Sequence, residues 1–383
     1  MTGKTRDVII VGAGPAGAVL AYLLARFGLD VLVLEKANLP RYKTCGGGVT
    51  LKTLQNLPFD ASPVYECQAV GGILSYAGRQ LLKADLGWTV AWTVMRGRFD
   101  HFLIQQAVMA GAELIEGVAV ERVTLHEDRA VAHSAQGDYA GRLLIGADGV
   151  NSEVARSLGL LPERRVGVAV EAEVAVPSAG LAAQGAYATF DFGALPHGYG
   201  WIFPKQDHLS VGVFQARPGK AAGLRQRLDQ FIACQPALQG GQILHFQGHP
   251  IPLGATRQPL HRGRALLVGD AANLADPWLG EGIYYAVLSA RLAAPILLAA
   301  LETGSSDLCE YTRQVQHEII SQQRYAAWFA HIVYRLPKQA SLLLSHSPRM
   351  QELLFSVIRG DRTFRQMSAG LARGLPRILL ESI

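Results

Sequence analysis

A glycine-rich turn near the N-terminus constrains the fold of this chain more than any other feature. The apolar run Val8–Val11 leads into Gly12-Ala-Gly-Pro-Ala-Gly17, a helical pattern follows, and the second apolar run, 31–34, ends on Glu35. In such a turn the first glycine permits a sharp bend, the second lets the backbone approach a pyrophosphate, and the third lets the helix pack on the sheet. The helix N-terminus adds free N–H groups and a positive dipole end. We therefore predict a dinucleotide-binding βαβ unit in which Glu35 accepts hydrogen bonds from a ribose 2′-OH.

Composition indicates a globular intracellular protein. The 383 residues suffice for two or three domains, and with 49% hydrophobic and 17% charged residues the chain is not disordered. The longest apolar run, 292–301, contains Pro295 and is far shorter than the ~20 residues that span a bilayer. The first strand begins within a few residues of the start, which leaves no room for a signal peptide, so we expect a cytoplasmic protein. No nucleic-acid partner is predicted.

The four cysteines indicate a reducing compartment. They show no CxxC pairing and no ligand spacing with histidine, which argues against a zinc site, an iron–sulfur cluster and a disulfide scaffold. No metal site is predicted. The cysteines are Cys45, Cys67, Cys234 and Cys309.

Two later segments favour a flavin dinucleotide. A strand near 143–146 breaks at Gly146 and is followed by Asp148, and a second strand ends on Gly269-Asp270 before the turn 277–283 opens a long helical pattern. A carboxylate at the end of a strand can hold ribityl hydroxyls, and a helix N-terminus can stabilise the negative charge of a reduced flavin. The alternative is a core strand followed by a helix cap.

Together with the first turn, these segments resemble the FAD-binding fold of aromatic hydroxylases of the p-hydroxybenzoate hydroxylase type. That group also includes flavin halogenases and prenyl reductases. The resemblance implies an α/β fold: a discontinuous Rossmann-type FAD-binding domain, an inserted substrate domain of mostly antiparallel β-sheet, and a C-terminal helical segment. The short runs bounded by Gly and Pro between 165 and 251 agree with a sheet domain. The expected bounds are 1–60, 97–160 and 255–303 for the FAD domain, 61–96 and 161–254 for the sheet domain, and 304–383 for the helical segment.

Three motifs resemble the geranylgeranyl reductase family, which saturates allylic double bonds of polyprenyl chains with reduced FAD. They are Pro40-Arg-Tyr-Lys-Thr-Cys-Gly-Gly-Gly48, the run 197–204 containing YxWxFP, and Pro277-Trp-Leu-Gly-Glu-Gly-Ile283. The leading prediction is therefore an FAD-dependent reductase acting on a geranylgeranyl chain in a lipid, quinone or chlorophyll precursor. A flavin-dependent monooxygenase or halogenase is the alternative, and the first two motifs favour the reductase. An electron carrier to membrane quinone is disfavoured, because four scattered cysteines cannot build the iron–sulfur cluster of the related quinone oxidoreductases.

The resemblance also implies a set of cofactor contacts. Arg41 and Arg96 are expected at the FAD phosphates or ribityl chain, although each could equally be a surface cation. The predicted cofactor-binding residues are Gly12, Gly14, Ala16, Gly17, Glu35, Lys36, Arg41, Cys45, Gly46, Gly47, Arg96, Asp148, Gly269, Asp270, Gly280, Gly282 and Ile283.

Saturation of an isolated C=C bond needs a hydride on one carbon and a proton on the other, and the motifs suggest two proton sources, Cys45 and Tyr199. Cys45 could donate a proton, gate the site or only fill space. The glycines that follow it indicate close backbone approach to a flat ligand or a mobile loop. Tyr199, Trp201 and Phe203 alternate with small or aliphatic residues, so a strand would place all three on one face. That face would form the wall of a long apolar substrate channel, or else pack into an ordinary core.

All the formal charge of +5 lies at the C-terminus. From His331 to the end there are eight Lys and Arg residues and three acidic ones, interspersed with apolar clusters. Such a segment suits an interfacial position on an anionic membrane, and it equally suits a helical cap over the substrate cavity. The polyprenyl substrate and an external electron donor of the NADPH or ferredoxin type are the expected partners, because the chain has no second dinucleotide turn.

Overall fold

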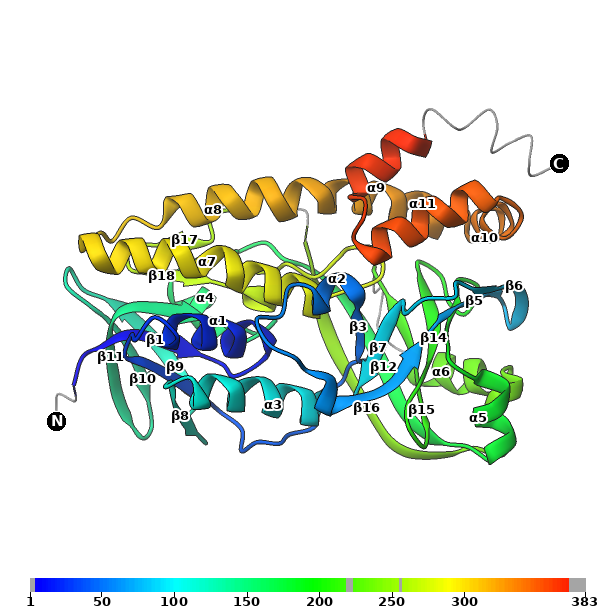
Figure 1. The fold of residues 1–383 in the computed structure, drawn as a ribbon, viewed down its shortest axis with the longest axis horizontal. Helices are drawn as coiled ribbons and strands as arrows, with labels where there is room; N and C mark the ends of the chain where they lie inside the picture. The colour runs from blue at the N-terminus through cyan, green and yellow to red at the C-terminus, as the bar shows by residue number, and fades with distance from the viewer. Residues whose placement is uncertain (1–3, 218–222, 255–256, 372–383) are drawn as a thin grey trace.

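The computed structural model describes residues 4–217, 223–254 and 257–371 (Figure 1). Three sheets form its framework. The strands are β1 (Arg6–Val11), β2 (Val31–Glu35), β3 (Gly48–Thr50), β4 (Tyr65–Ala69), β5 (Gly71–Tyr76), β6 (Arg79–Asp85), β7 (Ala91–Val94), β8 (Glu113–Glu116), β9 (Val120–Leu125), β10 (Ala130–Ser134), β11 (Gly137–Gly146), β12 (Arg165–Ala175), β13 (Tyr187–Asp191), β14 (Gly198–Pro204), β15 (Leu209–Gln215), β16 (Gln242–Leu253), β17 (His261–Arg262) and β18 (Ala265–Leu267). The α-helices are α1 (Pro15–Ala25), α2 (Leu51–Leu54), α3 (Arg96–Met109), α4 (Glu153–Ser157), α5 (Ser178–Gln184), α6 (Leu224–Ala233), α7 (Ile283–Thr303), α8 (Cys309–Val315), α9 (Ser321–Arg335), α10 (Pro337–His346) and α11 (Pro348–Arg359).

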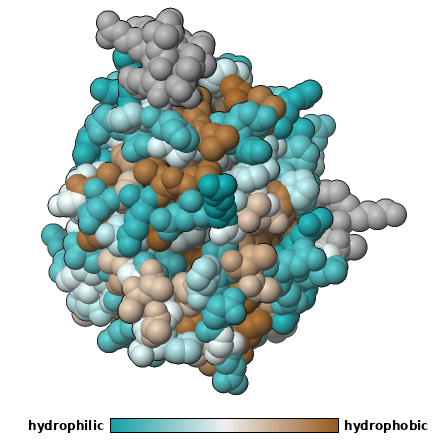
Figure 2. All heavy atoms as spheres, turned by 90° about the vertical axis from the view of Figure 1, so that its right-hand side faces the viewer, coloured by the Kyte–Doolittle hydropathy of each residue, from teal (hydrophilic) through white to brown (hydrophobic). Residues whose placement is uncertain are grey.

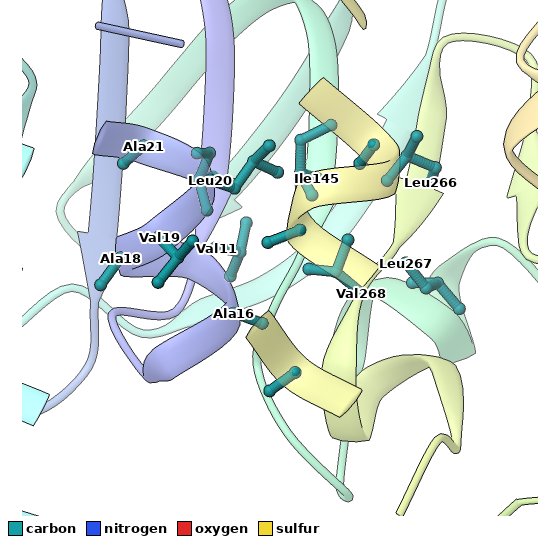
Figure 3. Packing of buried hydrophobic residues seen from close by; sticks show 14 of the residues in the cluster. Val11, Ala16, Ala18, Val19, Leu20, Ala21, Ile145, Leu266, Leu267 and Val268 are labelled. Carbon is teal, nitrogen blue, oxygen red and sulfur yellow. The ribbon is translucent and has the colours of Figure 1, made fainter. Parts of the chain in front are cut away.

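The first sheet carries the glycine-rich turn. Its strand order is β17-β18-β11-β1-β2-β8, and β1 pairs in parallel with both β2 and β11. Buried apolar side chains of α1, such as Leu20, lie on the side of Val11 of β1 and Ile145 of β11 (Figure 3). A βαβ crossover of this kind brings the carboxyl ends of β1 and β2, and the start of α1, to one edge of the sheet. The predicted βαβ unit is present.

The second sheet is the inserted one, with the order β16-β12-β15-β14-β13-β5-β6 and antiparallel pairs except for β13 with β5. One face packs on α6 through Ile202, Val211 and Phe231. The other face carries Tyr199, Trp201 and Phe214, which cluster with residues of α9 and α11. Figure 1 shows α5 and α6 on one side of this sheet, with α10 and α11 on the other.

The fold class is confirmed: a mixed α/β protein with a parallel sheet, separate antiparallel strands and a helical C-terminal region. The strands of the small third sheet, β3-β7-β4, flank β5 and β6 of the second sheet in the chain order. All strands of the first sheet come from the segments predicted for the FAD domain, and all strands of the second from those predicted for the sheet domain. The predicted domain bounds themselves stay a prediction.

Helix α7 is long and apolar enough to cross a membrane, judged by length and composition only. It packs on α1 and on the turn Gly269–Ala272, and 56% of its most apolar window is buried inside the protein. A helix that is apolar because it is buried needs no bilayer. We therefore interpret α7 as a core helix that covers the first sheet.

Candidate functional site

The three glycines of the first turn differ in the space around them. Gly12 has φ +105°, and a Cβ on it would overlap the carbonyl oxygen of Ala147, while a Cβ on Gly17 would overlap the carbonyl oxygen of Gly12. Packing therefore requires glycine at both positions. A Cβ on Gly14 would meet nothing within 4 Å, so the turn is open there. Helix α1 starts at Pro15 without a side-chain cap, and the neighbouring Ala16 is buried. An open glycine beside uncapped helical N–H groups fits a pyrophosphate.

Glu35 lies at the end of β2 and is 4% exposed. Its Oε2 accepts a hydrogen bond from the N–H of Ala13 at 2.8 Å, and its Oε1 accepts one from Ala37 at 3.1 Å. The carboxylate thus ties the end of β2 to the glycine-rich turn. Its predicted contact with a ribose stays a prediction, as does the cofactor contact of Lys36, whose side chain is exposed.

Arg41 and Arg96 are held by a residue that the sequence analysis missed. The buried carboxylate of Asp100 accepts hydrogen bonds from Arg41 Nη1 at 3.0 Å, from Arg96 Nε at 2.8 Å and from Arg96 Nη2 at 2.9 Å. Burial opposes the charge on Arg96, yet the Asp100 carboxylate and the Cys45 thiol raise its pKa. Neither arginine is a freely solvated surface cation. The spacing of Arg96 and Asp100, four residues apart on α3, could have revealed the pair.

Asp270 follows the last strand of the parallel sheet and lies near the start of α7. A Cβ on Gly282, the residue before α7, would lie 3.4 Å from Asp270 Oδ1. Burial raises the pKa of Asp270, while Lys43 and Arg96 oppose this shift. Among the described residues we find no hydrogen-bond donor to its carboxylate. A half-buried carboxylate that still has its acceptors free, beside an uncapped helix N-terminus, fits the ribityl hydroxyls of a flavin.

Gly269 and Gly280 shape the two turns around this carboxylate. Both have positive φ, +58° and +69°, which favour glycine. Ile283 is the first residue of α7 and is buried. Their cofactor contacts stay predictions.

Asp148 accepts hydrogen bonds from residues close to it in the sequence, which the sequence analysis did not predict. Its Oδ1 accepts a hydrogen bond from Ser152 Oγ at 2.6 Å, and its Oδ2 accepts from the N–H groups of Glu153 and Val154 at 2.7 and 3.1 Å. These bonds cap the N-terminus of α4. The carboxylate therefore has a structural role in any case, and its contact with the cofactor stays a prediction.

The glycines after Cys45 pack against the aromatic strand. A Cβ on Gly46 would lie 2.8 Å from the Phe203 ring and 2.9 Å from Trp201 Nε1. Gly47 has φ +67° and also lies against Val94. The close approach expected at these glycines is therefore made to protein side chains and backbone. Cys45 is half-buried, and its Sγ accepts a hydrogen bond from the N–H of Gly47 at 3.4 Å.

A third cation belongs to the same loop. Lys43 Nζ contacts His249 Nε2 of β16. Burial, with the nearby Arg96, lowers the pKa of Lys43 to about 8. Burial, together with Lys43, lowers the pKa of His249 to about 4, so the imidazole is neutral and accepts the hydrogen bond. Sequence reasoning missed His249, which lies 206 residues from its partner.

The aromatic strand is more buried than an open channel wall would be. Tyr199 and Trp201 are 6% and 5% exposed, and Phe203 is half-buried. The Tyr199 hydroxyl donates to the carbonyl oxygen of Leu279. The Tyr199 ring packs at a tilt on Phe190 and Phe214, and the Phe203 ring meets Phe190 in a T-shaped contact. Trp201 packs at a tilt on both Tyr199 and Phe203.

Next to these rings lies an apolar cavity of about 200 Å³. It is enclosed by the inner face of the second sheet, by the loop of Trp278 and by α9, α10 and α11. Tyr199, Trp201 and Phe203 are not among its lining residues. Apart from Gln339 and Ser341, the lining is apolar and includes Leu74, Phe192, Trp278, Phe329, Val333, Leu336, Leu344, Met350 and Met367.

Within the described residues, no group of three or more His, Cys, Asp or Glu side chains could hold a metal ion, and the four cysteines are free.

Comparison with known proteins extends these observations. A family model described as "FAD binding domain" matches residues 5–227. Digeranylgeranylglycerophospholipid reductase 1 of Methanopyrus kandleri is 29% identical to this chain, over 91% of the chain and 96% of that protein. A geranylgeranyl bacteriochlorophyll reductase-like protein from Thermoplasma acidophilum has the same fold, with a TM-score of 0.80, 23% identity and coverage of 99% and 98%. The halogenase PltM in complex with phloroglucinol and FAD also shares the fold, with a TM-score of 0.73, 17% identity and coverage of 96% and 86%.

Proposed function

Because this chain belongs to the FAD binding domain family and is an FAD-dependent oxidoreductase, we propose that it saturates carbon–carbon double bonds of a geranylgeranyl chain. The chain would be carried by a lipid, a quinone or a chlorophyll precursor. Relatives named as reductases of geranylgeranyl diphosphate and of digeranylgeranylglycerophospholipid support this proposal. So do the three motifs that follow the second cofactor strand.

The apolar cavity is the observation that carries the proposal. Its lining is almost entirely hydrocarbon and aromatic, which suits a prenyl chain because that chain offers no hydrogen-bonding groups along its length. The helices α9 to α11 form one side of the cavity. This position supports the expectation that the C-terminal segment is a helical cap over the substrate cavity.

Reduced FAD supplies the hydride for such a reaction. The residues of this chain would position and stabilise it: Gly14 and the start of α1 at the pyrophosphate, and Asp270 with the start of α7 near the flavin end. Cys45 and Tyr199 remain the candidates for the proton. Cys45 is the better candidate, because the Tyr199 proton is already engaged by the Leu279 carbonyl.

The outer surface of α9 and α10 suits delivery of the substrate from a membrane surface. Tyr325, Trp328, Ile332, Leu336 and Leu342 are exposed there, and Ile332 and Leu336 also line the cavity. Figure 2 looks onto the end of the molecule that carries α10 and shows apolar patches between polar residues. The exposed cations Arg324, Arg335 and Lys338 lie on the same two helices. We include peripheral contact with an anionic membrane in the proposal.

Arg373, Arg377 and the apolar cluster 378–380, which were part of the sequence-based membrane prediction, lie outside the described residues. The external donor of electrons stays a prediction, NADPH or a ferredoxin-like protein.

One experiment tests the reductase proposal directly. Anaerobically reduced holoenzyme is incubated with geranylgeranyl diphosphate and with geranylgeranyl lipids, and products are analysed by mass spectrometry. We expect a gain of two hydrogens for each reduced double bond, and a much smaller yield from Val333→Trp, which would fill the cavity. Unchanged substrates together with oxygen-dependent hydroxylation or halogenation of an aromatic compound would instead support the alternative function.

A further inference from the structure

The inner face of the second sheet carries two buried glutamates that none of the steps above uses. Glu171 and Glu173 of β12 are 1% and 5% exposed. Glu171 lies opposite Gly212 of β15, and Trp201 of β14 lies opposite the same glycine. Residues directly opposite each other in neighbouring strands point to the same face. The glutamates therefore share the face of the aromatic strand, towards the loop of Cys45.

The hydroxyl of Tyr42 joins the two carboxyl groups. It lies 3.0 Å from Glu171 Oε1 and 3.3 Å from Glu173 Oε1. A tyrosine hydroxyl has a single proton, so it can donate to only one of two carboxylates. For both contacts to be hydrogen bonds, the other carboxyl group must carry a proton and donate it to the tyrosine oxygen. The position of one hydroxyl between two buried carboxyl groups thus favours one proton shared within this trio.

The outer end of the trio reaches solvent through a histidine. Glu173 Oε2 lies 3.1 Å from His208 Nε2, and His208 Nδ1 lies 2.6 Å from Asp207, whose side chain is 85% exposed. Burial opposes the charge on His208, but its hydrogen bonds to Glu173 and Asp207 raise its pKa. A histidine in this position can take a proton from water and pass it inward.

The inner end of the trio faces the cysteine loop. Lys205 Nζ donates to the carbonyl oxygen of Gly46 at 2.8 Å and to that of Val94 at 2.8 Å, and its charge acts on Glu171, Glu173 and Cys45. Glu171 Oε2 and Trp201 Nε1 are both buried and have no hydrogen-bond partner among the described residues. The Glu171 acceptor and the Trp201 donor are therefore still free to bind another group on the face of the sheet where Gly46 packs.

We propose that His208, Glu173, Tyr42 and Glu171 form a proton relay that resupplies the site where the alkene is protonated. The inference rests on the proposed reductase function. In each turnover one alkene carbon receives the hydride from reduced flavin, which becomes oxidised, and the other carbon receives a proton from the group beside it. Glu171 replaces that proton and becomes a carboxylate. His208 then passes a proton taken up from solvent to Glu173, and this proton moves through Tyr42 to Glu171, which restores the shared proton of the trio.

The surrounding groups make Glu171 a suitable proton store. Burial and the neighbouring Glu173 raise the pKa of Glu171 to about 8, and Lys205 opposes the shift. From β16, His245 lies opposite Glu173 and packs on the Tyr42 ring at 3.9 Å. A carboxyl group that stays protonated near neutral pH can both give and regain a proton there.

The test uses Glu171→Gln and Tyr42→Phe, with Asp229→Asn as the matched control. Glutamine keeps a hydrogen-bonding partner for Tyr42 but cannot transfer a proton, and the partly exposed Tyr42 tolerates loss of its hydroxyl. Asp229 is an exposed carboxylate on α6 that pairs with Arg225. In anaerobic stopped-flow experiments, reoxidation of the reduced holoenzyme by a geranylgeranyl substrate should slow by about 100-fold in both variants. The wild-type fall in rate above about pH 8 should disappear in Glu171→Gln, whereas FAD content and reduction by dithionite should not change.

A second readout does not depend on the substrate. Infrared spectra of the holoenzyme should show a buried protonated carboxyl group at pH 7 that is lost in Glu171→Gln and kept in Asp229→Asn. If no prenyl substrate reoxidises the wild type, the proposed function fails while this band still tests the shared proton. Absence of the band in the wild type, or wild-type reoxidation rates and pH dependence in both relay variants, would overturn the relay.

Discussion

The side-chain amine of Lys205 donates a 2.8 Å hydrogen bond to the carbonyl oxygen of Gly46 and so ties the inserted sheet to the loop that follows β2. The two residues are 159 positions apart in the sequence. Lys205 is 3% exposed, and the glycine next to it in space lies against Trp201 and Phe203. This contact places Cys45 at the junction between the cofactor-binding sheet and the aromatic strand.

The first prediction concerns the packing of that loop. Gly46→Ala should destabilise the protein by about 1–3 kcal/mol, because its Cβ would lie within 2.9 Å of two aromatic side chains. Gly48→Ala is the matched control, since its Cβ would lie 3.5 Å from Phe203, an ordinary contact distance. Urea unfolding measures both variants. Equal stability of the two would contradict the packing described here.

The second prediction concerns Glu35. Glu35→Arg should lose most of its FAD, because the cation replaces both the predicted ribose acceptor and the carboxylate that holds the N–H of Ala13. The ratio of flavin to protein absorbance in the purified variant measures this loss. Glu121→Arg, on the exposed side of β9, should keep its flavin. Full flavin content in Glu35→Arg would remove Glu35 from the cofactor site.

The third prediction separates chemistry from packing at Cys45. Cys45→Ala should retain FAD and slow alkene reduction by at least about 10-fold, if the thiol handles the proton. Cys67→Ala changes another half-buried thiol and should leave the rate unchanged. Single-turnover reoxidation of the reduced flavin is the measurement. A wild-type rate in Cys45→Ala would show that the thiol only fills space.

The fourth prediction concerns stability and pH at His249. Its pKa is lower in the folded protein, about 4, than the ordinary value of 6.5, so the folded state binds fewer protons than the unfolded state between these values. Stability should therefore decline as the pH falls from 6.5 towards 4. The contribution of this half-buried histidine should be about 1–2 kcal/mol. His249→Gln should show a correspondingly shallower decline in chemical denaturation at a series of pH values, and identical slopes would contradict the assignment.

The fifth prediction concerns the outer surface of α9 and α10. The protein should bind anionic liposomes at low ionic strength and be released by salt, at roughly 1 kcal/mol for each cation near the surface. Trp328→Glu should weaken flotation, because it places a carboxylate on this surface. Phe27→Glu changes another exposed aromatic residue, beyond the end of α1, and should have no effect. Lack of flotation of the wild type would leave α9 to α11 as a cap alone.

The sequence by itself determined the fold class and the identity of the cofactor, FAD. Gly12, Gly17 and the strand ending on Glu35 are close in the chain, and the φ of Gly12 and the contact of Gly17 with Gly12 are local requirements. Local steric requirements of this kind leave a readable pattern in the residues. The alternation of Tyr199, Trp201 and Phe203 likewise indicated one face of a strand.

Only the tertiary structure decided which side chains meet across the two sheets. The spacing of Arg96 and Asp100 could have indicated their pair, but nothing in the sequence relates Asp100 to Arg41, 59 residues away. No spacing relates His249 of β16 to Lys43 either. Glu171 and Glu173 did leave a signal, two acids at alternate positions of an apolar strand, which puts both on one face. Whether that face is solvated or buried depends on the loop of Tyr42, whose hydroxyl contacts both carboxyl groups, and on Gly212, which strand pairing places opposite Glu171. Contacts between segments more than a hundred residues apart are set by sheet order and register, and a single sequence carries no periodicity that encodes them.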